Sequence, residues 1–319
     1  MGQRPVGLSK SGRWGTTFAT VAALTLSVAV SVTGLVVGSA GAVTRKIDVV
    51  AAENEYGNVA AQVGGKYVSV TSVESNPNTD PHSYEVSPGV AEAVAAAQVV
   101  IQNGVGYDAF MEKIESASPS STREVIDVQT LLGLSDSTTN PHLWYSPATM
   151  PAVASALATD FIELDPSDAS YFKASAARFL RSLNPWLSAI ADFKAAHAGV
   201  RVATTEPVAD YLLRALGADD LTPFTLQADI MNGVDASPQD VSLEETLFAK
   251  HQVKVFVYNQ QVTDSLTQSF IADAKRAGVP IVGVYETMPT PGYSFQSWML
   301  AEVDALTRAV VEHRSTTRL

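Results

Sequence analysis

The sequence predicts an α/β protein with two parallel-sheet α/β lobes joined by one long rigid helix, and a ligand site in the cleft between the lobes. Three observations lead to this fold. Short apolar segments rich in β-branched residues alternate with helical patterns in the first half of the chain. A long helical pattern then covers residues 165–198. After it, the alternation of strand-like and helix-like segments begins again.

The N-terminal lobe is expected over residues 44–164. Its strand-like segments are short and largely apolar, which is typical of strands buried on both faces. Each is followed by a helical pattern, and such repeats favour a parallel sheet because a parallel strand pair needs a crossover connection. The expected strands are 46–52, 67–73, 98–104 and 123–128, and the expected helices are 54–65, 89–97, 107–117 and 148–164.

The segment 165–198 is expected to form one long linking helix that ends at Gly199. About thirty helical residues span about 45 Å at 1.5 Å per residue, which exceeds what a crossover in a small sheet needs. A proline inside a helix removes a backbone hydrogen bond, so Pro185 should kink it. We therefore expect this helix to connect the two lobes.

The C-terminal lobe is expected over residues 199–314. The same alternation occurs here, and Ser237 followed by Pro238 is a typical helix start. The expected strands are 200–205, 222–227, 253–259 and 279–286, and the expected helices are 207–217, 237–251, 264–278 and 294–314.

Residues 1–42 have the pattern of an export signal. Arg4, Lys10 and Arg13 precede an uncharged run, which ends near the small residues at 40–42. The apolar stretch Phe18–Val37 is also long enough to cross a bilayer, about 30 Å as a helix. Cleavage after residue 42 and an uncleaved anchor therefore both stay open. In either case we expect the rest of the chain in the periplasm or at the extracellular face of the membrane.

The composition restricts the partners of the exported part. Without residues 1–42 it carries 18 basic and 33 acidic groups, which disfavours binding to nucleic acid or anionic lipid. The chain has no cysteine, so it has no disulfide, no thiolate ligand for a metal and no cysteine for lipid attachment. A metal site would have to use nitrogen and oxygen ligands.

Two similar turns carry histidines in the N-terminal lobe. Residues 80–88 read DPHSYEVSP and residues 140–147 read NPHLWYSP. Proline fixes its own φ and restricts the residue before it, so each turn should hold its histidine, His82 or His142, in one conformation. The preceding Asp or Asn side chain can accept hydrogen bonds from nearby backbone N–H groups.

Two glutamates stand at matching places in the C-terminal lobe. Glu206 and Glu286 each follow an expected strand, at the edge where parallel sheets bind ligands. Together with His82 and His142 they make an N₂O₂ set suited to a divalent metal ion. Each residue alone has an ordinary explanation, a solvated turn for a histidine or a helix start for a glutamate, and it is their joint placement that favours a metal site.

Other notable side chains lack this context. Three histidines lie on or at the ends of helical patterns and are expected at the surface: His197, His251 and His313. Four aromatic residues are expected to be packing residues: Tyr84, Trp144, Trp186 and Trp298.

Several segments resemble the zinc- and manganese-binding solute-binding proteins of ABC importers, the cluster A-I family. They are VVAAENEYGNVAAQVGG, DPHSYE, NPHLWYSP, TEPVADYLLRALG and YNQQVTDSL…AGVPIVGVYETMP, and the resemblance covers residues 46 to about 310. It implies two α/β lobes bridged by a long rigid helix, with the ion held between them by one residue from each of four loops. By motif these residues are His82, His142, Glu206 and Glu286.

Two departures from the family pattern affect the choice of ion and the membrane attachment. Zinc-dedicated members often carry a third histidine where this chain has Glu206, and a His/Asp-rich loop where residues 131–140 contain no histidine. More oxygen ligands suit Mn²⁺, although Zn²⁺ binds most such sites more tightly. Mn²⁺, Zn²⁺ and Fe²⁺ therefore all stay open. The lipid-bearing cysteine of many members is absent.

The function predicted from these features is capture of a divalent metal ion outside the cytoplasm and its delivery to the membrane permease of an ABC importer. The ion is the transported ligand, and we expect a monomer with no catalytic residue, no resident cofactor and no nucleic-acid partner. Two alternatives stay open. One is a metal-dependent hydrolase, which would need an open metal position and a general base. The other is a surface adhesin with a structural metal site.

Overall fold

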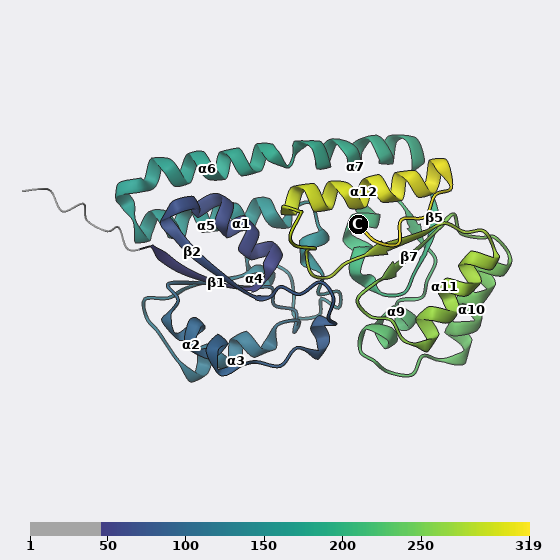
Figure 1. Ribbon diagram of the computed structural model, residues 1–319, viewed down its shortest axis with the longest axis horizontal. Helices are drawn as coiled ribbons and strands as arrows, with labels where there is room; N and C mark the ends of the chain where they lie inside the picture. The colour runs from purple at the N-terminus through teal and green to yellow at the C-terminus, as the bar shows by residue number, and fades with distance from the viewer. Residues whose placement is uncertain (1–45) are drawn as a thin grey trace, which may run out of the picture. The chain divides into compact units, whose positions relative to one another are not determined.

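The computed structural model describes residues 46–319, which belong to one compact unit. Two separate four-stranded parallel sheets lie in this unit, one in each lobe (Figure 1). The expected fold class is therefore confirmed. The predicted export signal lies outside the described residues. Among the residues that are described, none of the helices combines the length and the apolar character needed to cross a bilayer.

The N-terminal sheet has the strand order β2-β1-β3-β4. In its centre Val49 pairs with Val70 on one side and Val99 on the other. Because all four strands are parallel, their carboxyl ends meet at one edge. The strands are β1 (Ile47–Glu53), β2 (Val68–Glu74), β3 (Val99–Gln102) and β4 (Glu124–Asp127).

Helices cover both faces of this sheet. The helices α1 and α5 pack together on one face, and α2 and α3 pack on the other (Figure 1). The helices of this lobe are α1 (Asn54–Gly64), α2 (Pro88–Ala96), α3 (Ala109–Ala117), α4 (Val128–Leu131) and α5 (Thr149–Leu164).

The C-terminal sheet repeats this plan with the order β6-β5-β7-β8. Val257 of β7 pairs with Thr204 of β5 and with Val282 of β8, so β7 lies between these two strands. The strands are β5 (Arg201–Thr204), β6 (Asp219–Asp220), β7 (Val255–Asn259) and β8 (Ile281–Val284). The helices are α8 (Asp210–Leu216), α9 (Phe224–Met231), α10 (Pro238–Ala249), α11 (Ser265–Arg276) and α12 (Phe295–Glu312).

The linking segment is helical but divided. It forms α6 (Ala169–Ser182) and α7 (Asn184–His197), which run one after the other along both lobes (Figure 1). The break at Leu183 lies just before Pro185, where the missing N–H was expected to disturb the helix. The N–H of Leu187 still bonds to the carbonyl of Leu183 at 3.0 Å, so the helical path continues past the break.

One apolar core runs through both lobes. It includes residues of β1, α5, α6, α7 and α12. Trp186 of α7 packs edge-on against Phe295 of α12, with ring centroids 5.8 Å apart. Trp144, Trp186 and Trp298 are fully buried, as expected of packing residues. A shared core of this kind resists a large hinge motion, because opening would expose apolar surface to water.

One sequence prediction about the C-terminal lobe was wrong. Residues 222–227 were expected to be a strand, but they belong to the approach to α9 and its first turn. The buried positions Leu226 and Ile230 are four residues apart, which is helical spacing. The strand next to β5 is instead β6, only two aspartates long, and it carries no strand-like pattern.

The expectation of surface histidines was right for two of three. His251 and His313 are exposed. His197 is half-buried, because its ring packs on Phe193 at a centroid distance of 5.2 Å.

Glu302 of α12 offers a test of this buried core. Its carboxyl is fully buried and accepts a hydrogen bond from Trp298 Nε1 at 2.9 Å, and burial raises its pKa to about 8. Between about pH 4.5 and 8 the folded chain keeps this proton while the unfolded chain loses it. The unfolded state then binds fewer protons, so this group makes stability fall as pH rises through that window.

We therefore expect the Glu302→Gln variant to lose less stability than the wild type between pH 5 and about 8. Thermal unfolding of both proteins in chelator, at several pH values, measures the difference. Glu163→Gln changes an exposed glutamate of α5 and should keep the wild-type profile. Parallel profiles for Glu302→Gln and the wild type would contradict the assignment.

Candidate metal centre

The two proline–histidine turns share one side-chain hydrogen bond, although His82 lies within a short 3₁₀ helix, Pro81–Ser83, and His142 directly precedes one, Leu143–Tyr145. Asp80 Oδ1 accepts the backbone N–H of His82 at 2.8 Å, and Asn140 Oδ1 accepts that of His142 at 3.0 Å. These are the side-chain-to-backbone bonds expected of Asx turns. Each turn thus holds its histidine backbone in a fixed direction at the carboxyl edge of the N-terminal sheet.

His142 is the deeper ligand candidate and is fully buried. Its Nδ1 lies 2.8 Å from Asn140 Oδ1. The Nδ2 group of Asn140 donates to the carbonyl of Pro207 at 2.7 Å, so the oxygen of this amide must face the histidine. His142 Nδ1 is therefore the donor, and Nε2 is directed to the cleft, an arrangement typical of metal-binding histidines.

Glu286 connects the two histidines from the other lobe. It follows β8 and is fully buried. Its Oε2 lies 3.1 Å from His82 Nε2 and 3.3 Å from His142 Nε2. Within the described chain, this is the one group of three or more acidic or histidine side chains whose ligand atoms all lie within 4.8 Å of one another.

The charges in this group are set by burial and by the contacts with Glu286. Burial alone would raise the pKa of Glu286, but the close contacts with His142 and His82 outweigh it and hold the pKa well below its usual range. Burial lowers the pKa of His142. For His82, which keeps a quarter of its side-chain surface exposed, burial is outweighed by Glu286 and the pKa is raised. The outer histidine therefore holds a proton more readily than the inner one.

Glu206, the fourth predicted residue, lies outside the three-atom group. It follows β5 and is almost fully buried. Its Oε2 accepts from Asn259 Nδ2 at 3.2 Å, while its Oε1 is buried with no hydrogen-bond partner among the described residues. Burial, together with the nearby Glu286, raises its pKa well above the usual range. An orphaned buried oxygen fits a site in which a cation would supply the missing partner.

Sequence reasoning missed Tyr107, which also contacts the group. Its hydroxyl donates to Glu286 Oε2 at 2.9 Å. The turn before it has three positive φ angles in a row, 78° at Gly104, 56° at Val105 and 73° at Gly106. Valine is strained in this region, so the turn is held by its surroundings, including a bond from Val105 N to Gln129 Oε1 at 2.7 Å. The one available sequence signal for this turn was the pair Gly104 and Gly106, which comes shortly after β3.

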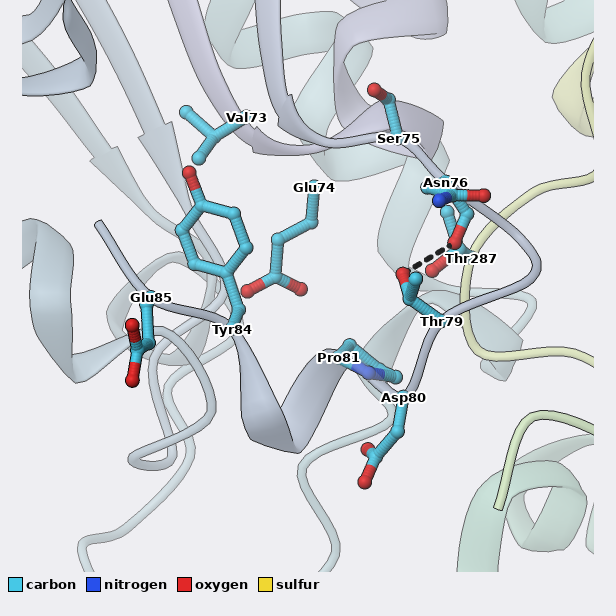
Figure 2. Close-up of a pocket in the computed structure, with 10 residues that line it drawn as sticks. All are labelled: Val73, Glu74, Ser75, Asn76, Thr79, Asp80, Pro81, Tyr84, Glu85 and Thr287. Atoms are coloured by element: carbon cyan, nitrogen blue, oxygen red, sulfur yellow. Dashed lines mark hydrogen bonds between the residues drawn. The ribbon is translucent and has the colours of Figure 1, made fainter. Parts of the chain in front are cut away.

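Further carboxyl groups line the same edge of the N-terminal sheet. Glu53, Glu55 and Glu74 are buried, and burial is the main cause that raises their pKa values, to about 8 for Glu55 and about 9 for Glu74. These two groups therefore keep their protons at neutral pH. Figure 2 shows the Glu74 carboxyl directed into a cavity of about 340 Å³ beside the His82 turn, between Tyr84 and Pro81.

The amino-acid sequence also matches the model of a known protein family. The family model described as ZnuA, zinc-uptake complex component A, periplasmic, matches residues 49–309. The chain belongs to this family. The family resemblance seen in the sequence segments is thereby confirmed.

Two curated relatives of this ZnuA-family chain are manganese-binding lipoproteins named MntA. That of Bacillus subtilis is 27% identical over 166 residues, 49% of this chain and 54% of the relative. That of Halalkalibacterium halodurans is 29% identical over 129 residues, 40% of this chain and 43% of the relative. The matched region thus spans about half the length of these relatives.

Solved structures share the fold over nearly their whole length. The SBP FpvC of Pseudomonas aeruginosa in complex with Mn²⁺ has a TM-score of 0.67 at 21% identity, covering 84% of this chain and 100% of that one. The laminin-binding adhesin Lmb of Streptococcus agalactiae, in a mutant structure, has a TM-score of 0.69 at 16% identity, covering 83% and 99%. A ZnuA crystal structure has a TM-score of 0.67 at 19% identity, covering 83% and 99%.

Tyr107 gives a test of the contacts around Glu286. In metal-free protein we expect Tyr107→Phe to lower the free energy of unfolding by about 1.5–3 kcal/mol, because a buried charged acceptor loses a donor. Urea unfolding in the presence of a chelator measures this change. Tyr84→Phe is the matched control, since the Tyr84 hydroxyl has no hydrogen bond within the described residues. Equal small effects of both variants would contradict the role given to Tyr107.

Proposed function

We propose that this chain captures a divalent transition-metal ion, Mn²⁺ or Zn²⁺, outside the cytoplasm and, as a monomer, delivers it to the membrane permease of an ABC importer. The observation that carries the proposal is the convergence of His82 Nε2, His142 Nε2 and Glu286 Oε2 from two lobes, with His142 and Glu286 buried. Glu206, with its unpartnered buried oxygen, is the proposed fourth ligand. Two nitrogens and two oxygens are a suitable donor set for such ions.

In this proposal the ion binds between the two histidines and Glu286, and its bonds to them replace the contacts that these side chains now make with one another. Glu286 Oε2 and the two Nε2 atoms would turn from each other to the ion. The ion would then link the lobes, because the histidines belong to one lobe and the glutamates to the other. The binding energy is available only in the folded chain, so the ion should stabilise the fold.

Entry and release would depend on movement of the His82 loop. Gln260 Nε2 donates to the carbonyl of Pro77 at 3.3 Å, and Gln261 Nε2 donates to that of Thr79 at 2.8 Å. These two bonds tie the loop to the C-terminal lobe. Since one core unites the lobes, a local opening of this loop is less costly than a hinge motion of whole lobes.

Metal titration tests the function directly. We expect Mn²⁺ or Zn²⁺, added to metal-free protein at about 100 times its dissociation constant, to raise the free energy of unfolding by about 2.7 kcal/mol. The His82→Ala and His142→Ala variants should lose most of this stabilisation, because each removes one ligand. Calorimetric titration and thermal unfolding measure binding and stabilisation in the same samples.

The control for this titration is His251→Ala, which removes an exposed histidine of the C-terminal lobe. It should bind the ions like the wild type. Failure of both ions to bind or stabilise the wild type would refute the proposed function. Unchanged binding in both His82→Ala and His142→Ala would refute this assignment of the ligands.

We also propose that residues 1–42 direct export of the chain. The support is the basic start, the apolar run and the small residues at 40–42, together with the periplasmic description of the family. Mass spectrometry of the mature protein from its native host should find an N-terminus after residue 42. An intact N-terminus in the membrane fraction would instead indicate an uncleaved anchor.

A further inference from the structure

Asn259 occupies the position between the two glutamates of the site. It is the last residue of β7, which lies between β5 and β8 in the sheet. Glu206 follows β5 and Glu286 follows β8. The carboxyl end of the middle strand therefore brings the Asn259 side chain between the two carboxylates, and this side chain is only 1% exposed.

The hydrogen bonds of Asn259 fix the direction of its amide. Its Oδ1 accepts the backbone N–H of Gln261 at 3.0 Å, so the oxygen faces away from the site. Its Nδ2 lies 3.2 Å from Glu206 Oε2 and 2.5 Å from Glu286 Oε1. The amide nitrogen has two hydrogens, and it donates one to each glutamate.

Asn259 thus donates to one oxygen of each carboxylate and leaves the other oxygen without a bond from this amide; at Glu286 that other oxygen, Oε2, accepts from the Tyr107 hydroxyl. The remaining oxygens are Glu206 Oε1, which is buried without a partner among the described residues, and Glu286 Oε2, which faces both histidines. With the two Nε2 atoms, the site then offers four ligand atoms, one from each side chain.

We propose that Asn259 is a positioning residue that restricts each glutamate to one-oxygen coordination, and thereby favours a four-coordinate ion such as Zn²⁺ over Mn²⁺. The inference rests on the proposed function. Zn²⁺ in sites closed by protein ligands is almost always four-coordinate and tetrahedral, whereas Mn²⁺ suits octahedral, oxygen-rich surroundings. Two-oxygen binding by the glutamates would supply the extra ligands, and the bonds from Asn259 oppose it.

The test compares the affinities of Zn²⁺ and Mn²⁺ in the full chain. In Asn259→Ala the carboxylates are free to bind through both oxygens. We expect the preference for Zn²⁺, measured as the ratio of the two dissociation constants by competition titration, to fall about tenfold, the factor that a hydrogen bond to a charged group is worth. Asn259→Ser, which can donate only one hydrogen bond, should give an intermediate ratio and serves as a second variant if the alanine variant does not fold.

Cobalt provides a readout that a general loss of structure would not imitate. Co²⁺ bound by four ligands absorbs visible light strongly, and with five or six ligands it absorbs weakly. We expect strong absorption for the Co²⁺-loaded wild type and a weaker band for Asn259→Ala. The matched control is Gln227→Ala, which removes another buried amide of the same lobe that donates to a carboxylate, Asp220, at 2.9 Å. It should leave the ratio and the spectrum unchanged.

The outcomes separate this inference from the proposed function. A wild type that binds neither Zn²⁺ nor Mn²⁺ would overturn both. A wild type that binds both ions, with a ratio and a Co²⁺ spectrum that Asn259→Ala and Asn259→Ser leave unchanged, would overturn the role of Asn259 alone. Weak absorption by the Co²⁺-loaded wild type would also overturn it, and so would equal changes in Gln227→Ala.

Discussion

A single carboxylate oxygen, Glu286 Oε2, receives contacts from two histidines and a tyrosine of the opposite lobe. A fully buried carboxylate is costly unless donors surround it, and here Tyr107 of the N-terminal lobe donates to Oε2 while Asn259 of the C-terminal lobe donates to Oε1. The position of His82, His142 and Tyr107 therefore depends on this one atom. It also depends on the parallel sheets, because their carboxyl edges face each other across the cleft and direct loop residues to the same point.

The surroundings of this atom are built to hold it in place. Asn140 orients His142 and also bonds to Pro207 of the other lobe. Asn54 of α1 exchanges two hydrogen bonds with the backbone of Met288, two residues beyond Glu286. Neutral amides thus fix the loops that carry the charged groups. Such support is what a preorganised ligand site requires, because it lowers the cost of ordering each ligand.

The sequence was most informative where the physical signal is local. A proline before a histidine, with an Asp or Asn before the proline, predicts an Asx turn from neighbouring residues alone, and both turns were found. The strand ends that carry Glu206 and Glu286 were equally visible, because buried parallel strands read as continuous apolar segments.

The sequence was least informative where a role depends on tertiary contacts. β6 is two aspartates long, and it is a strand only because it pairs with β5. Tyr107 and Asn259 belong to the site because distant strands bring them to Glu286, and no spacing along the chain reveals that meeting. The sequence could also not show that Glu206 lies outside the three-atom group, since this depends on where the tertiary fold places its carboxylate.

The bonds between the His82 loop and the C-terminal lobe join uncharged groups, the amides of Gln260 and Gln261 and the carbonyls of Pro77 and Thr79. Dissolved salt screens interactions between exposed charges, but it has little effect on contacts between neutral dipoles or on a buried ion pair. The loop should therefore stay closed over a wide range of ionic strength. The electrostatic attraction of the acidic surface for cations would then weaken as salt rises, while the closure of the loop over the site would not change.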